Sequence, residues 1–73
     1  VPADAPPLFI ALAGDDQMAV QSSIPLYSAW QAAGHTAELH IYAKGGHGFG
    51  MNTQNLPSDH WIERFGEWLD TLW

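Results

Sequence analysis

Residues 8–13 read LFIALA, an unbroken apolar run of six that is followed directly by Gly14-Asp15-Asp16. A strand of this length without polar alternation is typical of a parallel sheet that is covered on both faces. Residues 36–43, TAELHIYA, alternate between apolar and polar side chains. That period of two predicts a second strand, half exposed and near a sheet edge.

A helix is expected between the two strands, over residues 24–33. Ser22 or Ser23 can cap its start. Pro25 suits its first turn, because a missing N–H costs nothing there. Gly34 suits the left-handed position that ends a helix.

The strongest periodic signal of the chain lies near its C-terminus. Ser58 is the expected cap, and Asp59 falls in the first turn, where the helix dipole favours an acid. Apolar residues then recur at helical spacing: Trp61, Ile62, Phe65, Trp68, Leu69, Leu72 and Trp73. This stripe predicts an amphipathic helix that begins after Ser58 and carries its apolar face to Trp73.

The order strand, helix, strand, helix predicts an α/β fold with a parallel sheet and a right-handed crossover. Both strands then end at the same carboxyl edge, which is where open α/β sheets place their sites. Asp15 and Asp16 follow the first strand, and the loop GGHGFG (residues 45–50) follows the second. The sequence therefore predicts that one of these acids lies within reach of His47.

An imidazole beside a carboxylate is two thirds of a serine-hydrolase triad, in which histidine is the general base and the acid fixes its tautomer. The third member should be a serine in a G-x-S-x-G turn, and this chain has none. The alternative interpretation is structural: His47 is an exposed turn residue, and the acids cap the next helix.

Composition excludes several classes of function. The chain has 73 residues, 47% of them hydrophobic, with a net charge of −6 and only Lys44 and Arg64 positive. Nucleic acids and anionic membranes need clustered cations, so neither is an expected partner. No cysteine is present, so disulfides and thiolate metal sites are excluded and the cellular compartment stays open. So much apolar surface in so short a chain suggests part of a larger domain.

The other histidines and the serines are expected to be structural. His35 follows a helix end, His40 lies on the polar face of the second strand, and His60 lies in the first turn of the last helix. Asp15, His40 and His47 lack the usual spacing of metal ligands, so no metal site is predicted. Ser22, Ser23, Ser28 and Ser58 fall in caps or helices and not in a nucleophile turn.

The stretch from Pro7 to Met51 closely resembles the C-terminal part of α/β-hydrolase esterases, of the acetyl-esterase, xylan-esterase-like and dienelactone-hydrolase-like types. More distantly it is similar to the prolyl oligopeptidase peptidases. The matching motifs are DDQM (15–18), LYSAW (26–30), AG (33–34), ELHIY (38–42) and GGHGF (45–49).

The resemblance implies that residues 1–73 are the C-terminal part of an α/β-hydrolase domain, without its nucleophile and oxyanion-hole region. It implies a serine esterase in the full-length protein, inactivity of the 73-residue chain alone, and no cofactor. The implied partners are a small-molecule or carbohydrate ester and the remainder of the domain.

In that family pattern His47 is the base, and Asp15 is the favoured acid because it follows the strand end directly and lies 32 residues before His47. Asp16 is the alternative. Phe49 and Met51 either line a substrate pocket or only pack the loop. Two other functions stay open: a non-catalytic α/β module that binds or assembles with another chain, and a fragment of a prolyl oligopeptidase-type serine peptidase.

Overall fold

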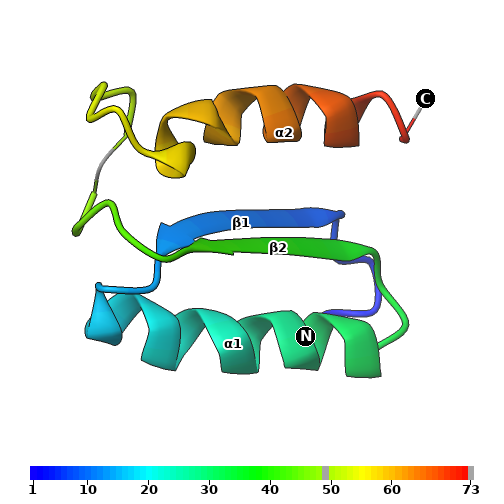
Figure 1. The fold of residues 1–73 in the computed structure, drawn as a ribbon. Helices are drawn as coiled ribbons and strands as arrows, with labels where there is room; N and C mark the ends of the chain where they lie inside the picture. The colour runs from blue at the N-terminus through cyan, green and yellow to red at the C-terminus, as the bar shows by residue number, and fades with distance from the viewer. Residues whose placement is uncertain (49, 73) are drawn as a thin grey trace.

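The computed structural model describes residues 1–48 and 50–72. Its elements in order are β1 (Leu8–Ala13), α1 (Gln17–Ala32), β2 (Ala37–Tyr42), a 3-10 helix (Pro57–His60) and α2 (Trp61–Leu69). The strands pair in parallel, from Leu8 opposite Ala37 to Ala13 opposite Tyr42. One helix lies on each face of this two-stranded sheet (Figure 1). The chain is thus a small mixed α/β unit, and the predicted parallel pairing is confirmed.

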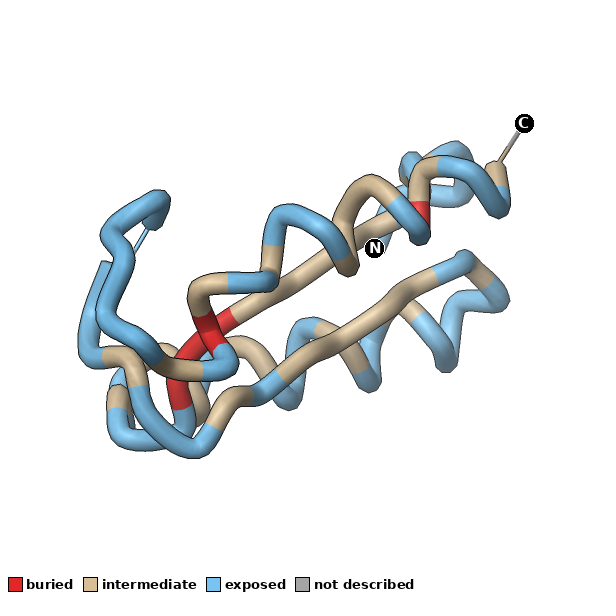
Figure 2. Tube along the Cα trace, turned by 45° about the horizontal axis from the view of Figure 1, so that its top comes forward, coloured by how far each residue is buried: buried red, intermediate tan, exposed pale blue. Residues whose placement is uncertain are grey.

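The buried apolar residues of the described chain lie on β1 and α2. Leu12 and Ala13 are buried on the strand, and Trp68 is buried on the helix (Figure 2). The ring of Phe9 lies 5.3 Å from that of Trp68 and 5.2 Å from that of Phe65, so a cluster of aromatic rings joins the two elements. Within the described part of the chain, neither helix is long and apolar enough to cross a membrane.

Helix α1 begins seven residues earlier than predicted, at Gln17. Its cap is Asp16, whose carboxylate accepts a hydrogen bond from the N–H of Ala19, and not Ser22 or Ser23. The Ser22 hydroxyl instead donates back to the carbonyls of Met18 and Ala19 within the helix. An acid directly after the strand satisfies the first turn, and Pro25 consequently lies inside the helix.

The last helix is shorter than predicted. A 3-10 turn over residues 57–60 precedes it, and it ends at Leu69, before the last residues of the apolar stripe. Ser58 does not cap it: the hydroxyl is fully buried and has no hydrogen-bond partner among the described residues. The Thr71 hydroxyl donates to the carbonyl of Trp68 and so occupies one of the acceptors that end the helix.

The polar face predicted for β2 is the face that α2 covers. Glu38 pairs with Phe9 across the sheet, and the His40 ring lies 5.4 Å from that of Phe9 and stacks on Tyr42. His40 Nε2 bonds to Glu38 Oε2 at 2.7 Å, which satisfies both polar groups on a half-buried face. Ile41 points to the opposite face and is exposed. Apolar and polar side chains do alternate along β2, but the polar ones lie on the face that α2 covers and Ile41 on the other face is exposed.

Candidate active site

The loops after β1 and β2 meet, and they bring His47 to Asp16. Nδ1 of the imidazole lies 2.5 Å from Oδ2 of the carboxylate. A carboxylate only accepts hydrogen bonds, so Nδ1 carries the proton and donates. The Asp16 side chain is 10% exposed and that of His47 is 83% exposed. A largely covered acid therefore holds an imidazole that faces solvent.

The two oxygens of Asp16 have different partners. Oδ2 accepts from His47, and Oδ1 accepts from the N–H of Ala19 at 3.3 Å, in the first turn of α1. The hydrogen bond from His47 is the main cause that lowers the pKa of Asp16 below its ordinary value. Burial acts in the opposite direction, and the backbone donors of the helix start add to the lowering.

Asp15, the acid favoured from the sequence, does not contact the imidazole. Its carboxylate accepts hydrogen bonds from two successive backbone groups of the histidine loop, Gly46 N–H at 2.9 Å and Gly45 N–H at 3.3 Å. The alternative, Asp16, is the residue that the structure pairs with His47. Side chains of consecutive residues point in different directions, and this one-residue difference decides which acid meets the ring.

The histidine loop is fastened on both sides of His47. Gln54 donates from its side chain to the carbonyl of Gly45, and the Trp61 indole N–H donates to the carbonyl of Gly50 at 2.7 Å. Gly46 has a φ of +75°, a conformation that side chains other than glycine adopt at a cost. Glycine at position 46 thus allows the loop to turn immediately before His47.

Phe49 and Met51 were predicted from the sequence as possible substrate contacts, and the structure adds no evidence for this role. Met51 is 72% exposed on the loop surface and contacts no pocket that the structure shows. Phe49 lies outside the described residues. Both stay predictions.

The remaining histidines lie away from the Asp16–His47 pair. His35 Nε2 bonds to the carbonyl of Pro2 near the amino ends of the strands, and His60 Nδ1 lies 3.4 Å from Glu63 Oε1 at the start of α2. His40 is engaged with Glu38. In residues 1–48 and 50–72, no three side chains of the metal-ligating types gather into a site.

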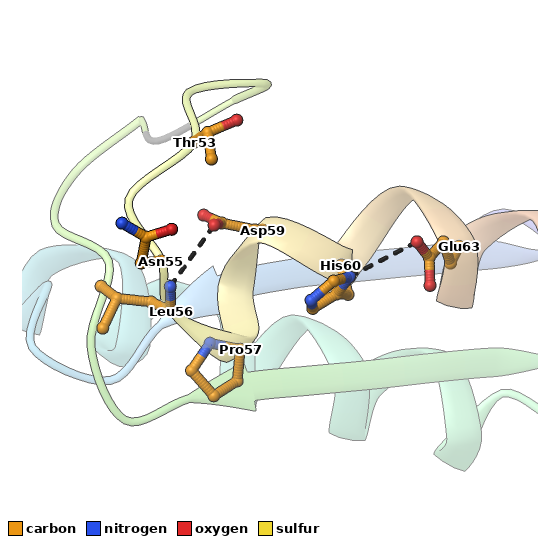
Figure 3. A pocket seen from close by; sticks show the side chains of 7 residues that line it. All are labelled: Thr53, Asn55, Leu56, Pro57, Asp59, His60 and Glu63. Atoms are coloured by element: carbon orange, nitrogen blue, oxygen red, sulfur yellow. Dashed lines mark hydrogen bonds and ion pairs between the residues drawn. The ribbon is translucent and has the colours of Figure 1, made fainter.

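A surface hollow beside the start of α2 was not expected from the sequence (Figure 3). It is lined by Thr53, Asn55, Leu56, Pro57, Asp59, His60 and Glu63. The Asp59 carboxylate accepts from the N–H groups of Gln54 and Leu56 and so shapes the loop above it. His47 does not line this hollow.

The arrangement around His47 suits proton transfer. Because Asp16 holds Nδ1, Nε2 is the nitrogen that can exchange a proton with a reacting group. No hydrogen bond between the described residues occupies it. None of the described serine hydroxyls is bonded to it either, so the described residues pair an imidazole with a carboxylate and place no serine on the other ring nitrogen.

The Asp16–His47 contact should weaken in acid. The pKa of Asp16 is lowered in the folded chain, so the contact stabilises the fold fully above pH 3.8, the ordinary value, and is lost as the pH falls through the lower, folded value. We expect the Asp16 carboxyl carbon, followed by NMR, to titrate with a midpoint below 3.8. In His47→Ala the midpoint should move upward, because its largest lowering cause is gone. A parent midpoint at or above the ordinary value would contradict the contact.

Comparison with protein-family models, with curated proteins and with solved structures found no match to this chain.

Proposed function

We propose that this chain contributes the histidine and the acid of a Ser-His-Asp triad to a carboxylic-ester hydrolase of the α/β-hydrolase type. One observation carries the proposal: a covered carboxylate accepts a hydrogen bond from Nδ1 of His47 and leaves the rest of the ring in solvent. That is the arrangement in which an imidazole acts as a general base through Nε2. The placement of both groups where parallel strands end supports it.

Each residue then has a defined role. A serine hydroxyl attacks the ester carbonyl while Nε2 of His47 takes its proton, and Asp16 stabilises the imidazolium that forms. The tetrahedral intermediate collapses, and the alcohol leaves with that proton. Water, deprotonated by His47, attacks the acyl-serine, and the acid product is released. Asp16 takes the place of Asp15 in this proposal because it is the acid that touches the ring.

The chain's own serines do not supply the nucleophile. No G-x-S-x-G stretch is present, Ser22, Ser23 and Ser28 lie within α1, and Ser58 is fully buried. The attacking serine and the amides that stabilise the oxyanion are proposed to come from a further segment of the hydrolase domain. The substrate is proposed to be a small ester or an acylated carbohydrate.

The test uses the protein that its natural reading frame encodes, treated with a fluorophosphonate probe that attacks activated serines. We expect one serine to be labelled, hydrolysis of p-nitrophenyl acetate to stop with labelling, and labelling to slow at least 100-fold in His47→Ala, because the serine loses its base. Equal labelling of parent and variant would contradict the proposal. Faster turnover of proline-containing peptides than of esters would favour a peptidase over an esterase.

A further inference from the structure

The two consecutive acids do different work, and we propose that Asp15 is a positioning residue, which holds the backbone of the histidine loop so that the imidazole of His47 meets Asp16. The catalytic consequence rests on the proposed hydrolase function. The positioning itself does not, because it concerns only contacts within this chain.

The contacts of Asp15 cross from one strand end to the other. Oδ1 accepts from Gly46 N–H at 2.9 Å, and Oδ2 accepts from Gly45 N–H at 3.3 Å. These donors lie one and two residues before His47 in the chain. Both oxygens of the carboxylate are used, each on a separate donor, so the loop backbone is fixed at two successive points.

The loop needs such a restraint because its own residues provide few. Gly45 and Gly46 have no side chains, and glycine loses more conformational freedom on ordering than any other residue. The His47 side chain is mostly in solvent, so packing does not fix its place. Gln54 fastens the carbonyl of Gly45, which leaves the two N–H groups to Asp15.

The solvent exposure of Asp15 indicates whether its hydrogen bonds mainly affect stability or the geometry of the loop. Asp15 is exposed, so its hydrogen bonds to the loop compete with water and add little to global stability. Their effect is geometric: they restrict where the ring of His47 can lie, and a displacement of about 1 Å at a reacting group is costly for catalysis. Asp15 therefore acts through His47 and is not itself expected to touch substrate.

The test compares Asp15→Ala and Asp15→Asn in the 73-residue chain by NMR. Both variants remove the negative charge next to Asp16, which by itself lowers the pKa of Asp16 through reduced repulsion. Loss of positioning acts in the opposite direction, because the hydrogen bond from His47 that lowers this pKa would be made less often. Asp15→Asn keeps one acceptor oxygen, so the pair separates the hydrogen bonds from the charge. Asp4→Asn removes an exposed charge elsewhere and controls for net charge.

We expect the Asp16 titration midpoint to shift upward in Asp15→Ala and to lie between that value and the parent's in Asp15→Asn. Amide hydrogen exchange at Gly45 and Gly46 should accelerate about tenfold in Asp15→Ala, because the carboxylate that accepts from these two N–H groups is gone and the loop opens locally more often. A downward shift of the midpoint in both variants, or unchanged exchange at the two glycines, would show that Asp15 acts only as a neighbouring charge. None of these readouts involves turnover, so failure of the positioning proposal and failure of the hydrolase proposal are distinguishable.

Discussion

Replacing His47 by alanine should lower kcat for a small ester by about 10⁴-fold or more in the protein encoded by the natural reading frame, because the general base is lost. The far-UV circular dichroism spectrum should not change, since the His47 side chain is 83% exposed and packs against little. Kinetics with p-nitrophenyl acetate measure the loss. Turnover within about tenfold of the parent would overturn the role of His47.

His35→Ala is the matched control for this variant. It removes another imidazole, which is bonded to the carbonyl of Pro2 far from the carboxyl edge of the sheet, and kcat should stay within about twofold. The two acids are compared in the same assay. Asp16→Asn should approach the loss seen for His47→Ala, because the ring tautomer is no longer fixed, whereas Asp15→Asn should cost less. The reverse order would make Asp15 the triad acid, as the sequence favoured.

Replacing Trp68 by alanine should destabilise the fold more than any other single change on α2. The side chain is 7% exposed, and its ring lies within 6 Å of the rings of Phe9 and Phe65. Truncation of a buried tryptophan costs about 3–5 kcal/mol, which is a large share of the stability of a domain of this size. Urea unfolding followed by far-UV circular dichroism should show either a much lower midpoint or an unfolded chain.

Two further variants separate packing from helix propensity. Trp68→Phe keeps an aromatic ring between β1 and α2 and should lose roughly half as much stability or less. Ile62→Ala lies on the same helix at an exposed position and should cost about 1 kcal/mol or less. If Trp68→Ala were no worse than Ile62→Ala, the aromatic cluster would not be the core of the chain.

The strands were well predicted because their signals are local. LFIALA gives β1 with both of its bounds, and the alternating stretch gives β2 to within one residue at each end. The parallel pairing follows from the crossover helix between them. What the alternation could not show is that α2 would cover the side of β2 that carries Glu38, His40 and Tyr42, since that depends on where a distant helix packs.

The start of α1 and the acid that contacts His47 were harder to predict than the strands, and both for the same reason. Asp16, Ser22 and Ser23 are all good caps, and only the direction in which the chain leaves β1 selects among them. The same direction turns Asp16 toward His47 and Asp15 toward the loop backbone. Composition and residue spacing cannot distinguish the two acids, because neither shows in which direction each side chain points. The sequence therefore predicted that an acid after β1 lies close to His47, but it could not show which of the two acids contacts the ring.

Asparagine at position 16 could not accept both hydrogen bonds of Asp16 on separate oxygen atoms, as aspartate does. Its amide has a single acceptor oxygen for two donors, the Ala19 N–H and the His47 ring, which aspartate serves with separate atoms. The start of α1 and the orientation of the His47 ring therefore both depend on the carboxylate of Asp16. A replacement at position 16 would therefore disturb the first turn of α1 and the orientation of the ring together.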